Sequence, residues 1–156
     1  MARSASITVS ISITRLALGF VAGFLATITF HQIGIWVLHA IGYIPFAAWN
    51  TAPRAPFGVP AVLSLSFWGG VWGILFVLIE RSLARFPGGY WVGATVFGAI
   101  VPTLVLMFVV FPLRGQPAGA GFAMNLILTF LLVHALWGLG TALILGVLTG
   151  WRTQPS

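Results

Sequence analysis

Two histidines and a glutamine interrupt an otherwise apolar run, FHQIGIWVLHAIG, over residues 30–42. A third histidine, His134, lies in another apolar run near the opposite end of the chain. Imidazole and amide groups inside an apolar helix are costly unless they have hydrogen-bond partners, so they often mark binding sites, proton relays or ion paths. The residues that could do chemistry are therefore His31, Gln32, His39 and His134.

The spacing of the histidines from the nearest arginines gives their depth in a membrane-spanning helix. His31 follows Arg15 by sixteen residues, a rise of about 24 Å, and His134 precedes Arg152 by eighteen residues, about 27 Å. We therefore predict that these two rings lie at a similar height. His39 lies about 12 Å beyond His31, so we expect it at the outer interface, where amphipathic rings are favoured.

Three interpretations of His31 and His134 remain open. Neutral histidines can be satisfied by hydroxyl, amide or carbonyl groups of neighbouring helices, for which the candidates at that depth are Gln32, Thr27, Thr29, Ser64 and Ser66. The two histidines and Gln32 can instead form a polar site at a transport gate. Histidines on two helices can also be the axial ligands of a b-type haem.

The remaining chemistry is sparse, so we expect no enzymatic activity. Glu80 is the single carboxylate, and we interpret it as a surface ion pair beside Arg81 and Arg85 in the segment ERSLAR. The chain has no cysteine, no HExxH motif and no GxSxG motif, which gives no reason to predict a catalytic residue or a metal site.

The composition places these residues in lipid. Of 156 residues, 60% are hydrophobic and 5% are charged, whereas a water-soluble domain has about a quarter charged. The net charge of +6 comes from scattered arginines, while nucleic-acid binding requires clustered basic residues, so no nucleic acid is expected.

Four apolar segments are long enough to cross a bilayer, which takes roughly 20 helical residues. Prolines and glycines separate them, as in YIPFAAWNTAPRAPFGVP, FPGG and RGQPAGAG. We predict an all-α integral membrane protein, a single four-helix transmembrane domain over residues 1–156, with helices at about 15–41, 60–82, 89–112 and 123–150. Residues 4–14 alternate hydroxyl and apolar side chains, a pattern that indicates either an edge strand or a loose lead-in to the first helix.

The arginines give the orientation. Five of them fall on the side of the N-terminus and two on the other, if the four helices alternate in direction: Arg3, Arg15, Arg81, Arg85 and Arg152 against Arg54 and Arg114. The positive-inside rule therefore predicts both termini in the cytoplasm of a prokaryote, with the chain in the inner membrane. Arg54 lies in a loop, where it could contact lipid phosphate or an anionic ligand.

Small residues predict where the helices meet, because membrane helices associate through close backbone packing. The candidate packing glycines are Gly19, Gly23, Gly69, Gly73, Gly138, Gly146 and Gly150. Most of them should join the four helices, although one pair could form a face for another chain. Pro102 lies in the middle of the third helix, where it predicts a kink or a hinge.

Two sequence echoes suggest a pair of repeated helical hairpins. FWGGVWG at 67–73 is similar to LWGLGTA at 136–142, and AGFLATI at 22–28 is similar to FGAIVPT at 97–103. Hairpins in one orientation, related by a pseudo-twofold axis, would explain both.

The functional expectation is a small non-enzymatic subunit whose partners are lipid and other transmembrane helices, from its own copies or from a larger complex. The alternatives are an oligomeric channel or transporter with a polar site at His31, Gln32 and His134, and a haem b electron-transfer subunit ligated by His31 and His134.

Overall fold

The structure, a computed structural model, describes residues 12–151 and is 76% helical. Four of its helices are long and apolar enough to cross a membrane. Each falls within two residues of a predicted segment: Ile13–Ala40, Ala61–Ala84, Gly89–Leu113 and Met124–Leu148. The first helix begins at Ile13 with Ser12 as its cap, so a strand is wrong for residues 13–14, and residues 4–11 lie outside the described part.

Two of these four helices are α-helical throughout, and the other two contain a π-helical turn. The first consists of α1 (Ile13–Ala26), the π-helix η1 (Thr27–His31) and α2 (Gln32–Ala40). The second is α3 (Ala61–Ala84) and the fourth is α6 (Met124–Leu148), both α-helical throughout. The third consists of α4 (Gly89–Val105), the π-helix η2 (Leu106–Val110) and α5 (Phe111–Leu113). A short hairpin of β1 (Pro53–Arg54) and β2 (Val59–Pro60) precedes α3, and the 3-10 helix η3 (Ala118–Phe122) precedes α6.

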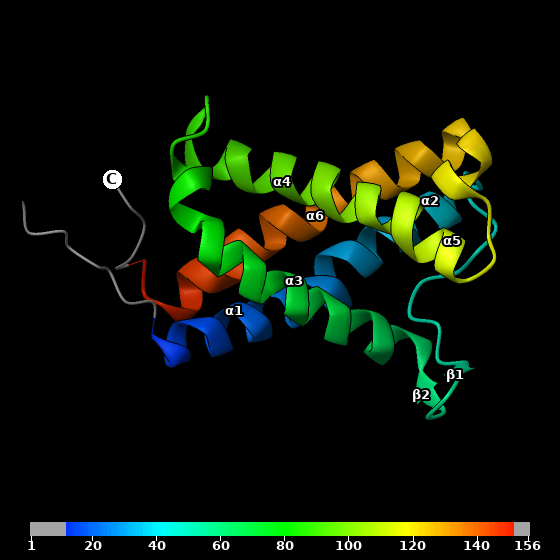
Figure 1. Ribbon diagram of the computed structural model, residues 1–156, viewed down its shortest axis with the longest axis horizontal. Helices are drawn as coiled ribbons and strands as arrows, with labels where there is room; N and C mark the ends of the chain where they lie inside the picture. The colour runs from blue at the N-terminus through cyan, green and yellow to red at the C-terminus, as the bar shows by residue number, and fades with distance from the viewer. Residues whose placement is uncertain (1–11, 152–156) are drawn as a thin grey trace, which may run out of the picture.

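The helices alternate in direction (Figure 1). The start of α1, the turn between α3 and α4 and the end of α6 lie at one end of the bundle, which we call the turn end. The two longer connections, residues 41–60 and 114–123, lie at the opposite end, which we call the loop end. Helix α1 packs against α3 and α6, and α4 packs against the same two helices.

Glycines let α1 and α3 approach each other at backbone distance. A Cβ atom on Gly23 would collide with the carbonyl oxygen of Gly69 and lie 2.9 Å from the Cα of Gly73. A Cβ atom on Gly19 would lie 2.7 Å from the carbonyl oxygen of Gly73. These four glycines therefore pack helices of the same chain against each other, through the close contact that stabilises helix pairs in lipid.

The second hairpin crosses in the same way. A Cβ on Gly98 would lie 2.5 Å from the carbonyl oxygen of His134 and 2.7 Å from the Cα of Gly138. Gly98 thus has the place of Gly23, and Gly138 that of Gly73. Repeated hairpins would make such matching contacts. In this alignment Gly138 corresponds to Gly73, the glycine of the second Trp-Gly pair in FWGGVWG.

The middle of the bundle is densely packed between these crossings. Ala22, Ala26, Phe76 and Ala94 are completely buried there, and the Trp137 indole N–H donates to the carbonyl oxygen of Gly23 at 3.0 Å. This indole bond joins α6 to α1 and therefore links the two hairpins. Close packing of this kind leaves little room for water.

Gly150 is not part of a packed helix, which corrects the prediction for this residue. Helix α6 ends at Leu148, so Gly150 lies beyond it, with a φ of 62° that suits a glycine at a helix end. The chain then turns back, and the Trp151 ring covers Gly146. The GxxxG spacing here reflects a helix end that the sequence pattern did not indicate.

Candidate functional site: a polar centre between three helices

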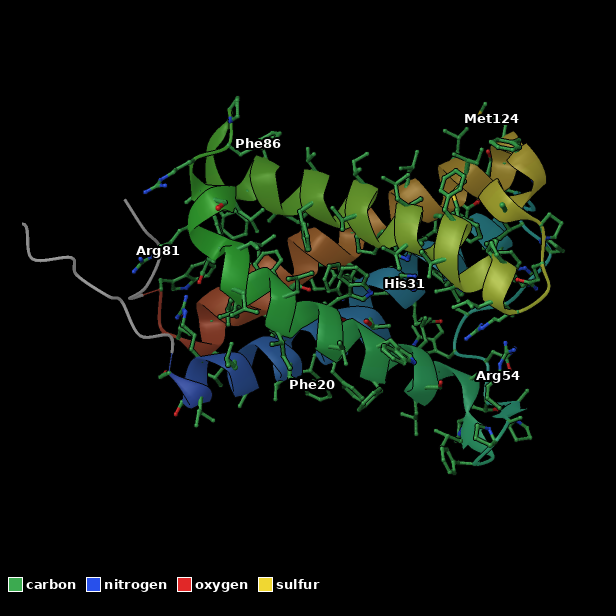
Figure 2. All side chains as sticks on the ribbon, in the orientation of Figure 1. Phe20, His31, Arg54, Arg81, Phe86 and Met124 are labelled. Atoms are coloured by element: carbon green, nitrogen blue, oxygen red, sulfur yellow. The ribbon has the colours of Figure 1, made fainter. Side chains whose placement is uncertain are left out.

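His31 and His134 lie side by side in the interior of the bundle, toward the loop end. Their ring centroids are 5.5 Å apart, with the planes tilted by 40°. His31 comes from η1 and is 7% exposed, and His134 comes from α6. Figure 2 shows His31 between the ribbons of the bundle. Similar depth alone does not predict this contact, which comes from the packing of η1 against α6.

Gln32 and the connection after α2 close one side of the pair. The backbone N–H of Trp49 donates to Gln32 Oε1 at 2.7 Å, and Gln32 Nε2 lies 3.4 Å from His31 Nδ1. The indole N–H of Trp49 donates to the carbonyl oxygen of Ile28 at 2.9 Å. In an α-helix the backbone N–H of Gln32 would donate to the carbonyl of Ile28, four residues earlier. In the π-helix it donates to the carbonyl of Thr27, five residues earlier, so the Ile28 carbonyl does not receive the α-helical bond.

Thr103 of α4 contacts the other histidine, a partner that the sequence analysis missed. Its Oγ1 lies 2.7 Å from His134 Nδ1, and Thr103 is buried. Three of the four hydroxyls predicted as partners are used elsewhere, because Thr27, Thr29 and Ser66 each donate to the carbonyl four residues earlier. Thr103 differs from those three residues because it directly follows Pro102. This position is the feature of the sequence that could have singled it out.

Aromatic side chains form the wall beside His134. The Phe130 ring stacks against it at a centroid distance of 6.5 Å, and Phe111 meets Phe130 edge to face at 5.6 Å. Phe111 also lines a hollow of about 220 Å³ at the loop end, together with Gln116, Pro117, Ala120 and Leu126. Two phenylalanines therefore separate this surface hollow from the polar centre.

His39, Arg54 and Pro102 are not parts of the histidine pair. His39 is exposed and donates from Nδ1 to the carbonyl oxygen of Ile44 at 3.1 Å. Arg54 lies on the exposed hairpin beside α3, well away from the label of His31 in Figure 2. Pro102 lies inside α4, four residues before η2, and is buried. Its use as a hinge stays a prediction.

Glu80 is buried and not on the surface, contrary to the sequence interpretation. It pairs with Arg15 at 2.5 Å, and the Tyr90 hydroxyl lies 3.5 Å from its other oxygen. Arg81 and Arg85 are exposed instead. The reason is geometric: α3 continues to Ala84, so the face that carries Glu80 still points toward α1 and α4 at this level. A local reading of ERSLAR did not reveal a partner 65 residues away.

Within residues 12–151, no group of three or more histidine, cysteine or acidic side chains could hold a metal ion. Haem ligation by the histidine pair stays a prediction. No family model, no curated protein and no solved structure matches the chain.

Proposed function

We propose that the chain is a multi-pass protein of a prokaryotic cytoplasmic membrane, with four crossings and both termini in the cytoplasm. The four apolar helices support contact with a bilayer. The start of α1 and the end of α6 lie at the same end of the bundle, as an even number of crossings requires (Figure 1). The arginine distribution supports the direction.

We further propose that it is a non-enzymatic subunit that packs against helices of its own copies or of a larger complex. An exposed aromatic face on α3 carries this proposal. Phe67 and Trp68 are 52% and 56% exposed, and their rings meet at 5.8 Å with Phe20 of α1 beside them. Trp68 lies seven residues into α3, about 10 Å below the helix end. Tryptophan favours the interface over the lipid interior, so another helix is its natural neighbour there.

The test is the oligomeric state after gentle extraction, measured by native mass spectrometry of the complex. Trp68→Leu combined with Phe67→Leu should release the partner, whereas Trp36→Leu, which alters an equally exposed tryptophan at the loop end, should not. A wild-type preparation that is monomeric and carries no other protein would contradict the subunit role.

A second candidate is a channel or transporter whose path includes the polar centre. The observation that favours it is the cluster of His31, Gln32 and His134, which lies beside two helices interrupted by π-helical turns, a distortion frequent at functional sites. Because the middle of the bundle is closed, passage requires α4 to move at Pro102. Flux into liposomes should fall in His31→Ala and His134→Ala and stay unchanged in His39→Ala. Flux that is equal in all three variants would contradict this role.

A further inference from the structure

The hydrogen bonds around His31 determine which of its ring nitrogens carries the proton. The Trp49 backbone N–H is only a donor, so the Gln32 atom that it contacts at 2.7 Å is the oxygen. The amide nitrogen of Gln32 therefore faces His31 Nδ1, at 3.4 Å, and it can only donate. His31 Nδ1 accepts that bond, and the proton of the neutral ring lies on Nε2.

The same argument applies to His134 through Thr103. Five other helical threonines donate to the carbonyl four residues earlier: Thr27, Thr29, Thr95, Thr129 and Thr141. The recorded bond of Thr103 Oγ1 is to His134 Nδ1, at 2.7 Å. A Thr103 hydroxyl that donates to Nδ1 places the proton of neutral His134 on Nε2 as well.

Neither Nε2–H group has a hydrogen-bond partner within the described residues 12–151. Because every fully enclosed side-chain nitrogen or oxygen of those residues has a partner, the two Nε2 atoms are not fully enclosed by protein. Two N–H donors on rings 5.5 Å apart therefore lack an acceptor from the described chain, and an N–H group without an acceptor is costly.

We propose that the His31–His134 pair binds the carbonyl oxygen of a ligand dissolved in the membrane. A carbonyl accepts two hydrogen bonds and donates none, which matches two N–H donors. A carboxylate or phosphate would bring a charge, and the pair consists of neutral rings with no cation recorded against them in the described structure, so burying that charge would be costly.

Two membrane components supply such an oxygen, the ring carbonyl of a quinone and the ester carbonyl of a phospholipid. Either could enter from the hollow at the loop end, past the Phe111 and Phe130 rings that separate it from His134. The inference rests on the polar centre alone and holds whichever proposed function is correct.

The first experiment measures the imidazole ¹⁵N chemical shifts of the full chain, labelled at histidine and reconstituted in lipid nanodiscs. His31→Phe, His39→Ala and His134→Phe assign the signals. We expect His31 and His134 to be neutral with the proton on Nε2. A proton on Nδ1 of either ring, or a charged ring, would overturn the inference.

The second experiment identifies the source of the carbonyl with the same signals. In nanodiscs of a diether phospholipid, which lacks ester carbonyls, a benzoquinone with a decyl tail is titrated, and the starting spectrum is compared with that in the matching ester lipid. A saturable shift on titration identifies a quinone, and a difference between the two lipids identifies an ester. No change in either arm would mean that the donors bind water only, which would overturn the proposal.

A matched pair of variants tests the geometry. Thr103→Val keeps the shape of the side chain and removes the hydroxyl that orients His134, so ligand affinity should fall by about tenfold. His39→Ala changes a histidine outside the centre and should bind like the wild type. The helical circular dichroism of both should match the wild type, and unchanged affinity in a folded Thr103→Val would contradict the assigned role of the hydroxyl.

Discussion

The buried pair of Glu80 and Arg15 gives the first prediction. Glu80→Ala should lower the free energy of unfolding by about 3 kcal/mol, because it removes the carboxylate that pairs with Arg15 in a largely buried site. Unfolding by sodium dodecyl sulfate in mixed micelles measures this. Arg81→Ala alters an exposed charge next to it and should change the stability little. Equal effects of the two variants would return Glu80 to the surface.

The polar residues differ in how much of their surroundings the sequence reveals. The similar depth of His31 and His134 can be predicted from helical rise and arginine positions. Their contact, and that of Thr103 with His134, depend on how separate helices pack, which the sequence does not show. For the same reason the sequence indicates a surface position for Glu80, since two arginines lie beside it, whereas the fold pairs it with Arg15.

Elements rather than single residues determine how the polar centre is closed. The π-helix η1 diverts the Gln32 amide to Thr27, and the carbonyl of Ile28 then binds the Trp49 indole. Apolar periodicity predicts a helix over this stretch but not the π-helical turn, because the extra residue leaves the hydrophobic pattern almost unchanged. The bond from the Trp49 indole to the Ile28 carbonyl therefore attaches the connection over residues 41–60 to the π-helical turn.

Removing the indole donor gives the second prediction. Trp49→Phe keeps an aromatic ring but loses the bond to Ile28, at a cost of about 1 kcal/mol. Amide hydrogen exchange over residues 41–60 should become faster. Trp36→Phe, at an exposed position on α2, serves as the control. Unchanged exchange in Trp49→Phe would show that the connection is held by other contacts.

The glycine crossing gives the third prediction. Gly23→Ala would push the new Cβ into the backbone of Gly69 and Gly73, which cannot move without separating α1 from α3. We expect a loss of about 1–3 kcal/mol in the same micelle titration. Gly34→Ala, further along the same long helix, would meet the ends of the Leu136 and Val133 side chains, which can shift, so it should cost less. The reverse order would contradict the assigned crossing.

At the scale of the whole molecule, composition and punctuation are sufficient to predict four long apolar helices with bounds within two residues. The sequence echoes suggest a repeat, but only the contacts of Gly98 and Gly138 indicate which residues of the two hairpins correspond. GxxxG spacing alone does not separate the glycine crossings from the pair Gly146 and Gly150, because the spacing contains no information about the end of α6 at Leu148.

The proposed orientation gives the fourth prediction. The chain contains no cysteine, so single cysteines report cleanly on each side of the membrane. Gln116→Cys at the loop end should react with a membrane-impermeant maleimide in intact cells, and Arg81→Cys at the turn end should react only after lysis. Labelling in the opposite order would place the termini outside.

The central claim is that the first and last long helices bring His31 and His134 together, and cross-linking tests it most directly. His31→Cys combined with His134→Cys, in native membranes, is treated with a short bifunctional methanethiosulfonate reagent, and the mass of the intact chain is then measured after denaturation. We predict the mass of one reagent molecule that joins both thiols, while His39→Cys combined with His134→Cys gains only singly attached molecules. Singly attached molecules in the first variant, as in the second, would contradict the shared polar centre.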